Sequence, residues 1–270
     1  MKQLLPLPIP TDLITSCDDL ERVKLEFEYH RWSTGGKILP AYRGEGRSIY
    51  TLRPSFCREV VHQNPMQSEK EMQCGLFEIL KIKKLERIIL NDHLIQMYRQ
   101  SWNLPLQLQH LRLPTRMLDW SLDIERALYF AVEDEKDWDS NGQLWCLFPN
   151  EPFTSRALND DYFEIQSTHF VNVSGFLNNN MEFQVGEKNR FNQLGVFTIQ
   201  PYELAYIPIE EQETPIGNLK KYEIPKDSKK HLKNTLEKKG VHEHTIYESK
   251  NPELDEIVSC VRKEYGYPPL

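Results

Sequence analysis

The sequence predicts an α+β fold in which a helical N-terminal part packs on a strand-rich half. Two observations support this prediction. Apolar residues recur at helical spacing in several segments before residue 134, and short runs of β-branched and aromatic residues separated by turn residues follow from residue 142 onward. Because the 270 residues contain neither an internal repeat nor a low-complexity tract, we expect one continuous domain.

The first predicted helix begins after Ser16. Asp19 follows three residues later, which is the spacing of a helix N-cap with a reciprocal partner. The segment 33–36, Ser-Thr-Gly-Gly, ends the helix. Its inward face is expected to carry four apolar side chains: Leu20, Val23, Phe27 and Trp32.

A short strand is expected next, over residues 38–42, running into a tight bend at Gly44 and Gly46. Strand ends of this kind are common places for a binding site. Residues 69–81 and 85–100 have the periodicity of two packing helices.

Residues 104–133 concentrate polar side chains among leucines and aromatics. We expect a loop or short helix at 104–110, a turn at 113–115 and a helix at 122–133. Ser121 is the predicted N-cap of that last helix, and acidic residues stand in its first turn, where the helix dipole favours negative charge.

Strand-like runs dominate the rest of the chain. The tail then predicts a strand, a helix that stops at Gly240, a turn and a final helix. The expected strands before the tail are 143–148, 170–173, 181–185, 194–200 and 203–207.

Composition limits the classes of function. With 40 acidic and 33 basic residues the formal charge is −7, so an anionic ligand must be met by a local cluster. The five cysteines are odd in number and lack ligand spacing, which predicts reduced, mostly buried thiols and no metal site. Neither a signal peptide nor a membrane span is expected, so we predict a cytoplasmic protein without a membrane partner.

Several catalytic motifs are missing. No GxxxxGK[ST] or GxSxG pattern occurs, and Gly44-Glu-Gly46 lacks the third glycine of a dinucleotide fingerprint. His242 and His244 are two residues apart, so they would not share one helical face as zinc ligands.

Arginines are the remaining signal. A guanidinium beside a glycine suits bidentate binding of phosphate, whereas pairing with Glu45, Glu59 or Asp119 would only tie loops to the core. Arg43 is the strongest ligand candidate, because it stands between an aromatic residue and a glycine at a strand end. The arginines concerned are Arg43, Arg47, Arg53, Arg58, Arg112 and Arg116.

Three residues of the central segment each have two interpretations. His110 is either a site residue or a neutral core histidine. Asp119 either caps a helix or binds Arg116, or it serves as the orienting carboxylate of a site. Trp120 either packs in the core or stacks on a base or nicotinamide ring.

The lysine-rich stretch 220–239 is either a solvated face or a guide for nucleic-acid phosphates.

Four segments carry a family resemblance: YRG at 42–44, LRPSFCRE at 52–59, LQHLRLPTRMLDWSLDIERALYFA at 108–131, and Arg190 with FNQLGVFTI at 191–199. Together they resemble the FRG domain, named for its (F/Y)RG motif. The resemblance divides the chain into a helical lead (1–37), an FRG-like core (38–200) and a C-terminal strand with helices (201–270).

Two departures from the family pattern stand in the central segment. Leu111-Arg112 occupies the place of smaller residues such as His-Gly, and residues 121–124 replace a Thr-x-Asn-Pro type of start.

The motif order is also similar, more distantly, to that of ADP-ribosyltransferases. This resemblance implies a split β-sheet core and an enzyme that uses NAD to modify a nucleic-acid or protein acceptor. It also implies a bacterial toxin or phage-defence effector, with an antitoxin as partner. The alternatives are a non-catalytic nucleotide or nucleic-acid binding module and an interaction subunit.

The same resemblance assigns roles to named residues. Arg43 would hold NAD, and Gln193 or nearby Glu187 would take the late catalytic position. The full expected sets are His110, Arg116, Asp119 and Gln193 for catalysis, and Tyr42, Arg43, Gly44, Arg53 and Trp120 for the cofactor.

Overall fold

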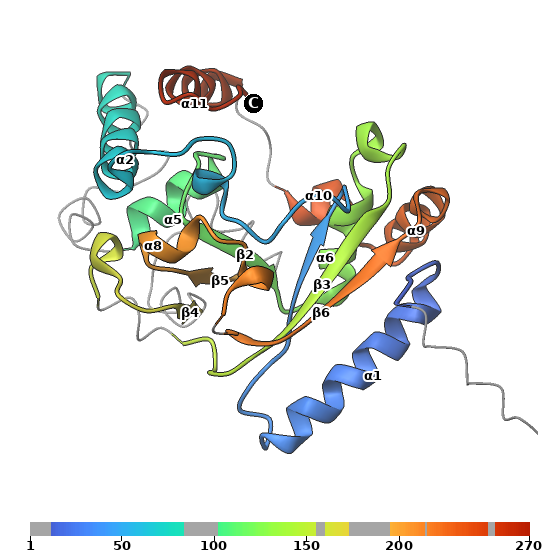
Figure 1. Cartoon of the computed structure of the whole chain (residues 1–270). Coiled ribbons are helices and arrows are strands. Elements are labelled where there is room, and N and C mark those ends of the chain that lie inside the picture. The colour runs from blue at the N-terminus through green and yellow to red at the C-terminus, as the bar shows by residue number, and fades with distance from the viewer. Residues whose placement is uncertain (1–11, 84–101, 155–159, 173–194, 214, 248–251) are drawn as a thin grey trace, which may run out of the picture.

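A computed structural model describes residues 12–83, 102–154, 160–172, 195–213, 215–247 and 252–270, apart from the side chains of residues 103, 104, 107 and 110. Its centre is a six-stranded antiparallel sheet of order β4-β5-β2-β1-β3-β6 (Figure 1). The strands are β1 (Ala41–Glu45), β2 (Met117–Ser121), β3 (Gly142–Pro149), β4 (His169–Val171), β5 (Gly195–Ile199) and β6 (Gly217–Ile224).

Helices cover the sheet and extend beyond it. The α-helices are α1 (Cys17–Ser33), α2 (Pro65–Ile82), α5 (Asn103–His110), α6 (Ile124–Val132), α8 (Tyr202–Ala205), α9 (Lys226–Lys238), α10 (Glu243–Ile246) and α11 (Pro252–Glu264). Short 3-10 turns lie at Ser55–Cys57, Glu135–Asp137, Tyr162–Glu164 and Ile209–Glu211. The predicted mixed α+β class is confirmed.

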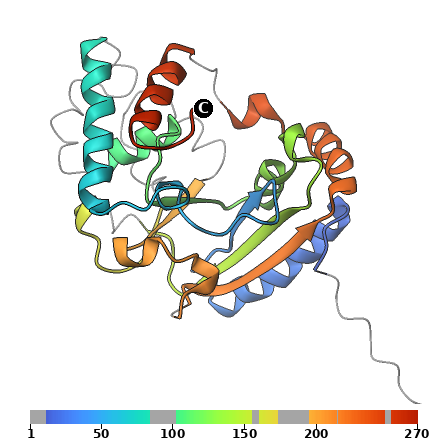
Figure 2. The ribbon, with the colours of Figure 1, turned by 45° about the horizontal axis from the view of Figure 1, so that its top comes forward.

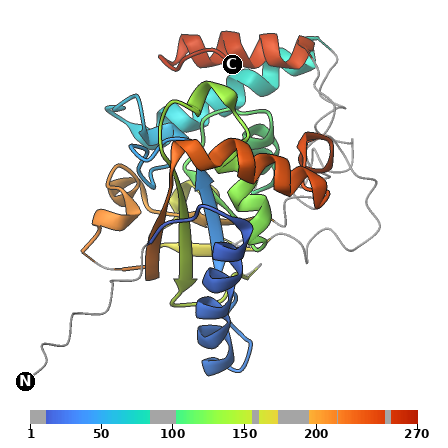
Figure 3. The same cartoon turned by 90° about the vertical axis from the view of Figure 1, so that its right-hand side faces the viewer.

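One face of the sheet is covered by α1, α6 and α9, which Figures 1 and 3 show on the same side. Their apolar side chains form a buried cluster with the strands, including Phe27 of α1, Leu128 of α6 and Leu232 of α9. On the opposite face Trp120, Trp145 and neighbouring aliphatic residues form a second cluster. Burial on both faces fixes the register of the central strands.

A separate helical layer lies away from α1. There α2 and α11 pack side by side (Figures 1 and 2). Apolar residues of α2, α8 and α11 fill the space between these helices, which places the C-terminus beside a helix from the first third of the chain.

The predicted first helix is confirmed, with one error. Ser16 and Asp19 form the reciprocal capping box, and Leu20, Val23 and Phe27 are buried. Trp32 was expected on the same face, but its side chain is 79% exposed. At 3.6 residues per turn, position 32 lies about 140° away from position 27, so it turns toward solvent.

The central segment differs most from expectation. Residues 117–121 form β2, where no strand was predicted, so Ser121 ends a strand and is not the N-cap of α6. Asp123 is the N-cap, and its carboxylate accepts from the backbone N–H groups of Glu125 and Arg126. Because β1 and β2 are central strands, the division into a helical half and a strand-rich half is only partial.

The other predicted helices and strands were partly correct. The helices expected at 69–81 and 122–133 and the strand at 143–148 are present, as is the order of the tail with its stop at Gly240. The segment 203–207 was predicted as a strand and instead contributes to helix α8, so that prediction was wrong. The elements expected at 85–100 and 181–185 lie outside the described residues.

Two further predictions concerned the cysteines and membrane-spanning helices. All five cysteines are free, but only Cys57 and Cys146 are buried, so the prediction of mostly buried thiols was wrong. Among the described residues, none of the helices has the length and apolar character needed to cross a bilayer.

Candidate functional site

The sheet opens between β1 and β2. These strands pair only at Tyr42 and Ser121, whereas β1 pairs with β3 through five positions and β2 with β5 through five. Beyond Tyr42, the edge of β1 that faces β2 therefore lacks strand-to-strand hydrogen bonds to β2. A break of this kind exposes backbone polar groups that need other partners.

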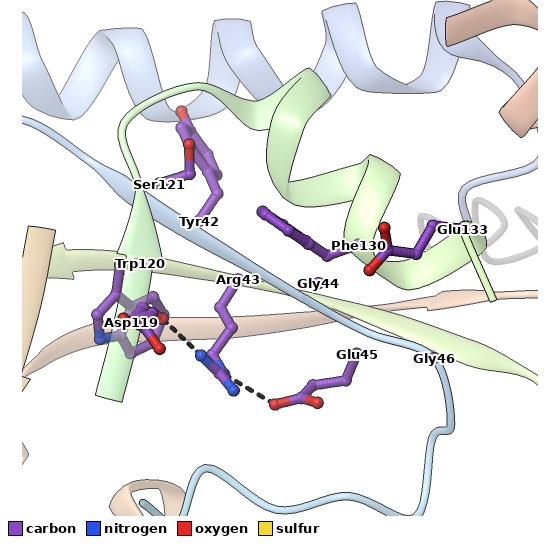
Figure 4. A pocket seen from close by; sticks show the side chains of 10 residues that line it. All are labelled: Tyr42, Arg43, Gly44, Glu45, Gly46, Asp119, Trp120, Ser121, Phe130 and Glu133. Atoms are coloured by element: carbon purple, nitrogen blue, oxygen red, sulfur yellow. Dashed lines mark hydrogen bonds and ion pairs between the residues drawn. The ribbon is translucent and has the colours of Figure 1, made fainter. Parts of the chain in front are cut away.

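A pocket of about 280 Å³ occupies this opening. Figure 4 shows Arg43 and Glu45 on one side of β1, and Phe130 of α6 and Glu133, which follows α6, on the other. The pocket is lined by Tyr42, Arg43, Gly44, Glu45, Gly46, Asp119, Trp120, Ser121, Phe130 and Glu133.

Gly44 is required by the packing of α6 on β1. A Cβ atom at this position would lie 1.9 Å from the carbonyl oxygen of Ala127 and 2.9 Å from the backbone nitrogen of Ala131. Gly44 also lies inside β1 and not in a bend, so the expected bend belongs to Gly46 alone. The glycine of the YRG motif thus brings the α6 backbone, with Phe130 and Glu133, to the pocket.

Arg43 bridges the opening. Its Nη1 donates to the backbone carbonyl of Asp119 over 2.7 Å, and its Nε donates to Glu45 over 2.8 Å. Glu45 also pairs with Arg58 at 3.3 Å. The guanidinium thereby replaces part of the missing β1–β2 ladder, and the carboxylate of Glu45 fixes its orientation.

Asp119 presents its carboxylate to the pocket. The side chain is accessible to solvent, and its Oδ1 accepts from Nε2 of Gln109 at 2.6 Å. Desolvation by the surrounding protein raises the pKa of Asp119, while the charge of Arg43 and the bond from Gln109 oppose that rise. Its expected partner Arg116 does not contact it, and Asp119 lies in a strand, so it does not cap a helix.

Glu133 was missed by the sequence reasoning. It follows the last residue of α6, and its Oε1 accepts from the hydroxyl of Tyr247 at 2.7 Å. Desolvation by burial raises the pKa of Glu133 to about 7. One sequence signal pointed to it: an acidic residue stands at the C-terminal end of the ALYFA helix, where the helix dipole disfavours negative charge.

The pocket is acidic in composition. Glu45, Asp119 and Glu133 line it together with a single arginine, Arg43. Glu45 pairs with both Arg43 and Arg58, and the carboxyl groups that line the pocket outnumber its single arginine, so a ligand with positive charge is favoured over a free anion.

Tyr42 and Trp120 reach the pocket but belong mainly to the core. Tyr42 is 6% exposed and packs edge-on against Phe27, and Trp120 is 2% exposed and donates from Nε1 to Thr198. The interpretation of Trp120 as a core residue agrees with the structure, and its ring is not free to stack on a ligand.

Arg116 lies in the interior, away from the pocket. It is fully buried, its Nη1 donates to the carbonyl of Gln200 at 2.6 Å, and its Nη2 donates to the carbonyl of Tyr162. Its guanidinium lies 3.7 Å from Glu69 and stacks on the ring of Tyr202. These contacts hold the guanidinium in the core, so the structure does not bring Arg116, which was expected among the catalytic residues, to the pocket.

Other expected site residues are not brought to the pocket. Arg53 is not among its lining residues, and its carbonyl accepts from Arg58. His110 ends α5, but its side chain, like Gln193 and Glu187, lies outside the described residues.

The lysine-rich tail is partly structural. Lys229 is fully buried, and its Nζ donates to the carbonyls of Gly46 and Asp137 at 2.5 and 2.6 Å. Lys220 pairs with Glu26 and Lys239 with Glu125. These contacts tie α9 to Gly46, Asp137 and α6, and β6 to α1, so the stretch is not a continuous solvated face.

Fold and pocket define a mixed α+β protein with an arginine-bridged, acidic pocket in its central sheet. Residues 40–140 match the family model of the FRG domain, so the chain contains an FRG domain over this segment. The segment contains β1, β2, α6 and every residue that lines the pocket. No curated protein and no solved structure matches the chain significantly.

Proposed function

We propose that the protein is an ADP-ribosyltransferase-like enzyme that uses NAD to modify a nucleic acid or a protein. The observation that carries this proposal is the set of carboxylates around Arg43 in the opening of the sheet. The nicotinamide ring of NAD is cationic, and positive charge develops on C1′ of the ribose as the glycosidic bond breaks. Carboxylates fixed beside that carbon stabilise such a transition state.

The opening between β1 and β2 supports the comparison with a split-sheet core. Arg43 lies in the first strand, as the motif order of ADP-ribosyltransferases implies. Within the described residues its Nη2 has no hydrogen-bond partner, whereas Nε and Nη1 are engaged. This nitrogen is therefore the atom of Arg43 that can donate to a ribose hydroxyl or phosphate oxygen.

The size of the pocket sets how much of NAD it would hold. Its volume of about 280 Å³ is at the lower end of small-molecule sites, which span roughly 300–1,000 Å³. A nicotinamide ribose fits this size, and the rest of the dinucleotide would lie along the surface. Such an activity suits a toxin or phage-defence effector, whose partner would be an antitoxin.

A non-catalytic phosphate-binding module has less support. Arg43 and Arg58 share the carboxylate of Glu45, and Arg116 is buried. A phosphate would have to compete with these internal carboxylates, which weakens binding.

The test incubates the protein with NAD labelled in its adenylate half, together with a cell extract. Nicotinamide release and transferred label are measured. Asp119→Asn and Arg43→Lys are expected to lower nicotinamide release by about 10²-fold or more. Asp119→Asn removes a charge, and Arg43→Lys removes the fork that can donate to Glu45, to the Asp119 carbonyl and to the ligand at the same time. Arg31→Ala is the matched control, since among the described residues Arg31 forms its ion pair with Glu28 on the surface of α1.

The outcomes separate the classes of function. If NAD raises the melting temperature without release of nicotinamide, the protein is a binding module. If NAD neither binds nor is cleaved, the proposal fails.

A further inference from the structure

The three carboxyl groups of the pocket differ in their partners. Glu45 pairs with Arg43 and Arg58, and Asp119 accepts from Gln109 and lies beside Arg43. Each of these two carboxyl groups therefore has an arginine beside it, and Asp119 also has an amide donor. Within the described part of the chain, Glu133 has no ion pair, and its one side-chain hydrogen bond comes from Tyr247.

The surroundings of Glu133 favour a proton on it. Burial disfavours its charge, the carboxyl end of α6 adds a negative dipole, and nearby acidic groups add repulsion. Burial is the largest of these effects and places the pKa of Glu133 at about 7. The charged and titratable groups of the described residues that act on it are Arg112, Tyr129, Asp134, Lys233, Glu243 and Tyr247.

Tyr247 fixes the carboxyl group of Glu133. Its ring packs edge-on against Phe130, with ring centroids 6.0 Å apart, and its hydroxyl donates to Oε1 of Glu133. Burial and the adjacent carboxylate raise the pKa of Tyr247, so the hydroxyl keeps its proton and remains a donor. Among the described residues Oε2 of Glu133 has no hydrogen-bond partner, so it can bind a group in the pocket.

We propose that Glu133 is the general base of the transfer reaction and that Tyr247 is its positioning residue. The acceptor is a hydroxyl or amine of a nucleic acid or protein, and it attacks C1′ of the nicotinamide ribose. The new bond forms as the C1′–N bond breaks, nicotinamide leaves as a neutral molecule with that electron pair, and the proton of the acceptor passes to Oε2 of Glu133. This inference rests on the proposed function.

The proposal also accounts for the shape of the site. Glu133 lies on the α6 side of β1, across the strand from Arg43 and Glu45 (Figure 4). Gly44, which has no side chain, separates the two sides. The acceptor is therefore expected to approach from the α6 side, while Arg43 contacts NAD from the other.

The test measures nicotinamide release and label transfer across pH for three variants. Glu133→Gln keeps the shape and accepts the bond from Tyr247, and it is expected to lower kcat by about 10²–10⁴-fold with little change in KM. Tyr247→Phe removes a hydrogen bond that lowers the pKa of Glu133, so the pKa of Glu133 should rise in this variant. The activity of Tyr247→Phe should therefore increase with pH at a higher pH than that of the native protein. Glu135→Gln is the control, because Glu135 is 71% exposed and does not line the pocket.

A stability measurement identifies the titrating group independently of turnover. A carboxyl whose folded pKa is raised stabilises the fold below its unfolded pKa and loses that contribution as pH rises to its folded pKa. The native protein should therefore lose stability relative to Glu133→Gln between pH 4.5 and about 7.

The results distinguish the two proposals. If the native protein releases nicotinamide and Glu133→Gln is equally active with the same pH profile, the role of Glu133 is refuted and the proposed function stands. If the native protein releases none, even when the stability difference shows that Glu133 titrates as expected, both proposals fail.

Discussion

Gly44→Ala tests the contact that builds the site. The added methyl would lie 1.9 Å from the carbonyl oxygen of Ala127, whereas ordinary contact begins near 3.4 Å. The α6 backbone must therefore retreat by about 1.5 Å, and backbone atoms cannot rotate away as a side chain can. We expect a loss of about 3 kcal/mol in the free energy of unfolding and a fall of about 6–12 °C in melting temperature.

Gly75→Ala supplies the matched control for this experiment. Gly75 lies inside α2, and among the described residues a Cβ there would meet only the hydroxyl of Tyr265, at 4.0 Å. The same chemical change should here stabilise the protein by about 1 kcal/mol, because alanine favours the helix. Both variants are compared by thermal and urea unfolding. A Gly44→Ala protein that melts within about 1 °C of the native protein would refute direct packing of α6 on β1.

Two further predictions concern stability. Arg112 adopts φ 63°, a conformation that favours glycine, and its carbonyl accepts a hydrogen bond from Arg262. Arg112→Gly should therefore keep that bond and raise the free energy of unfolding, measured in urea, by roughly 0.5–1 kcal/mol. A lower urea midpoint would contradict this. Glu69→Gln should cost about 3 kcal/mol, because it leaves the buried Arg116 uncompensated, whereas Glu71→Gln on the exposed face of α2 should stay within about 0.5 kcal/mol. Equal urea midpoints for these two variants would show that the buried pair is unimportant.

The backbone of Arg112 gives a physical reason for the small residue that the family pattern has at this position. The resemblance predicted a small residue such as glycine here, and the backbone has the left-handed conformation that a glycine adopts without strain. The structure thus explains the family preference through the backbone.

Local patterns in the sequence determined much of the secondary structure. The capping box of α1, the helix at 122–133, the strand at 143–148 and the glycine stop after α9 depend on interactions among residues close in the chain, which a pattern reports directly. The motif arginine at position 43 was also identified, because a charged residue between tyrosine and glycine at a strand end is an unusual combination.

Only the tertiary structure separated site from core. Arg43 and Arg116 both belong to motif segments and have the same chemistry, yet one borders the pocket and the other is buried against Glu69. That difference arises from partners 47 or more residues away, such as Glu69 for Arg116 and Asp119 for Arg43. Glu133 shows the same dependence, since burial raises its pKa and its hydrogen-bond partner, Tyr247, lies 114 residues further along the chain. Periodicity and spacing carry information about neighbours in sequence, whereas desolvation and charge pairing are set by neighbours in space.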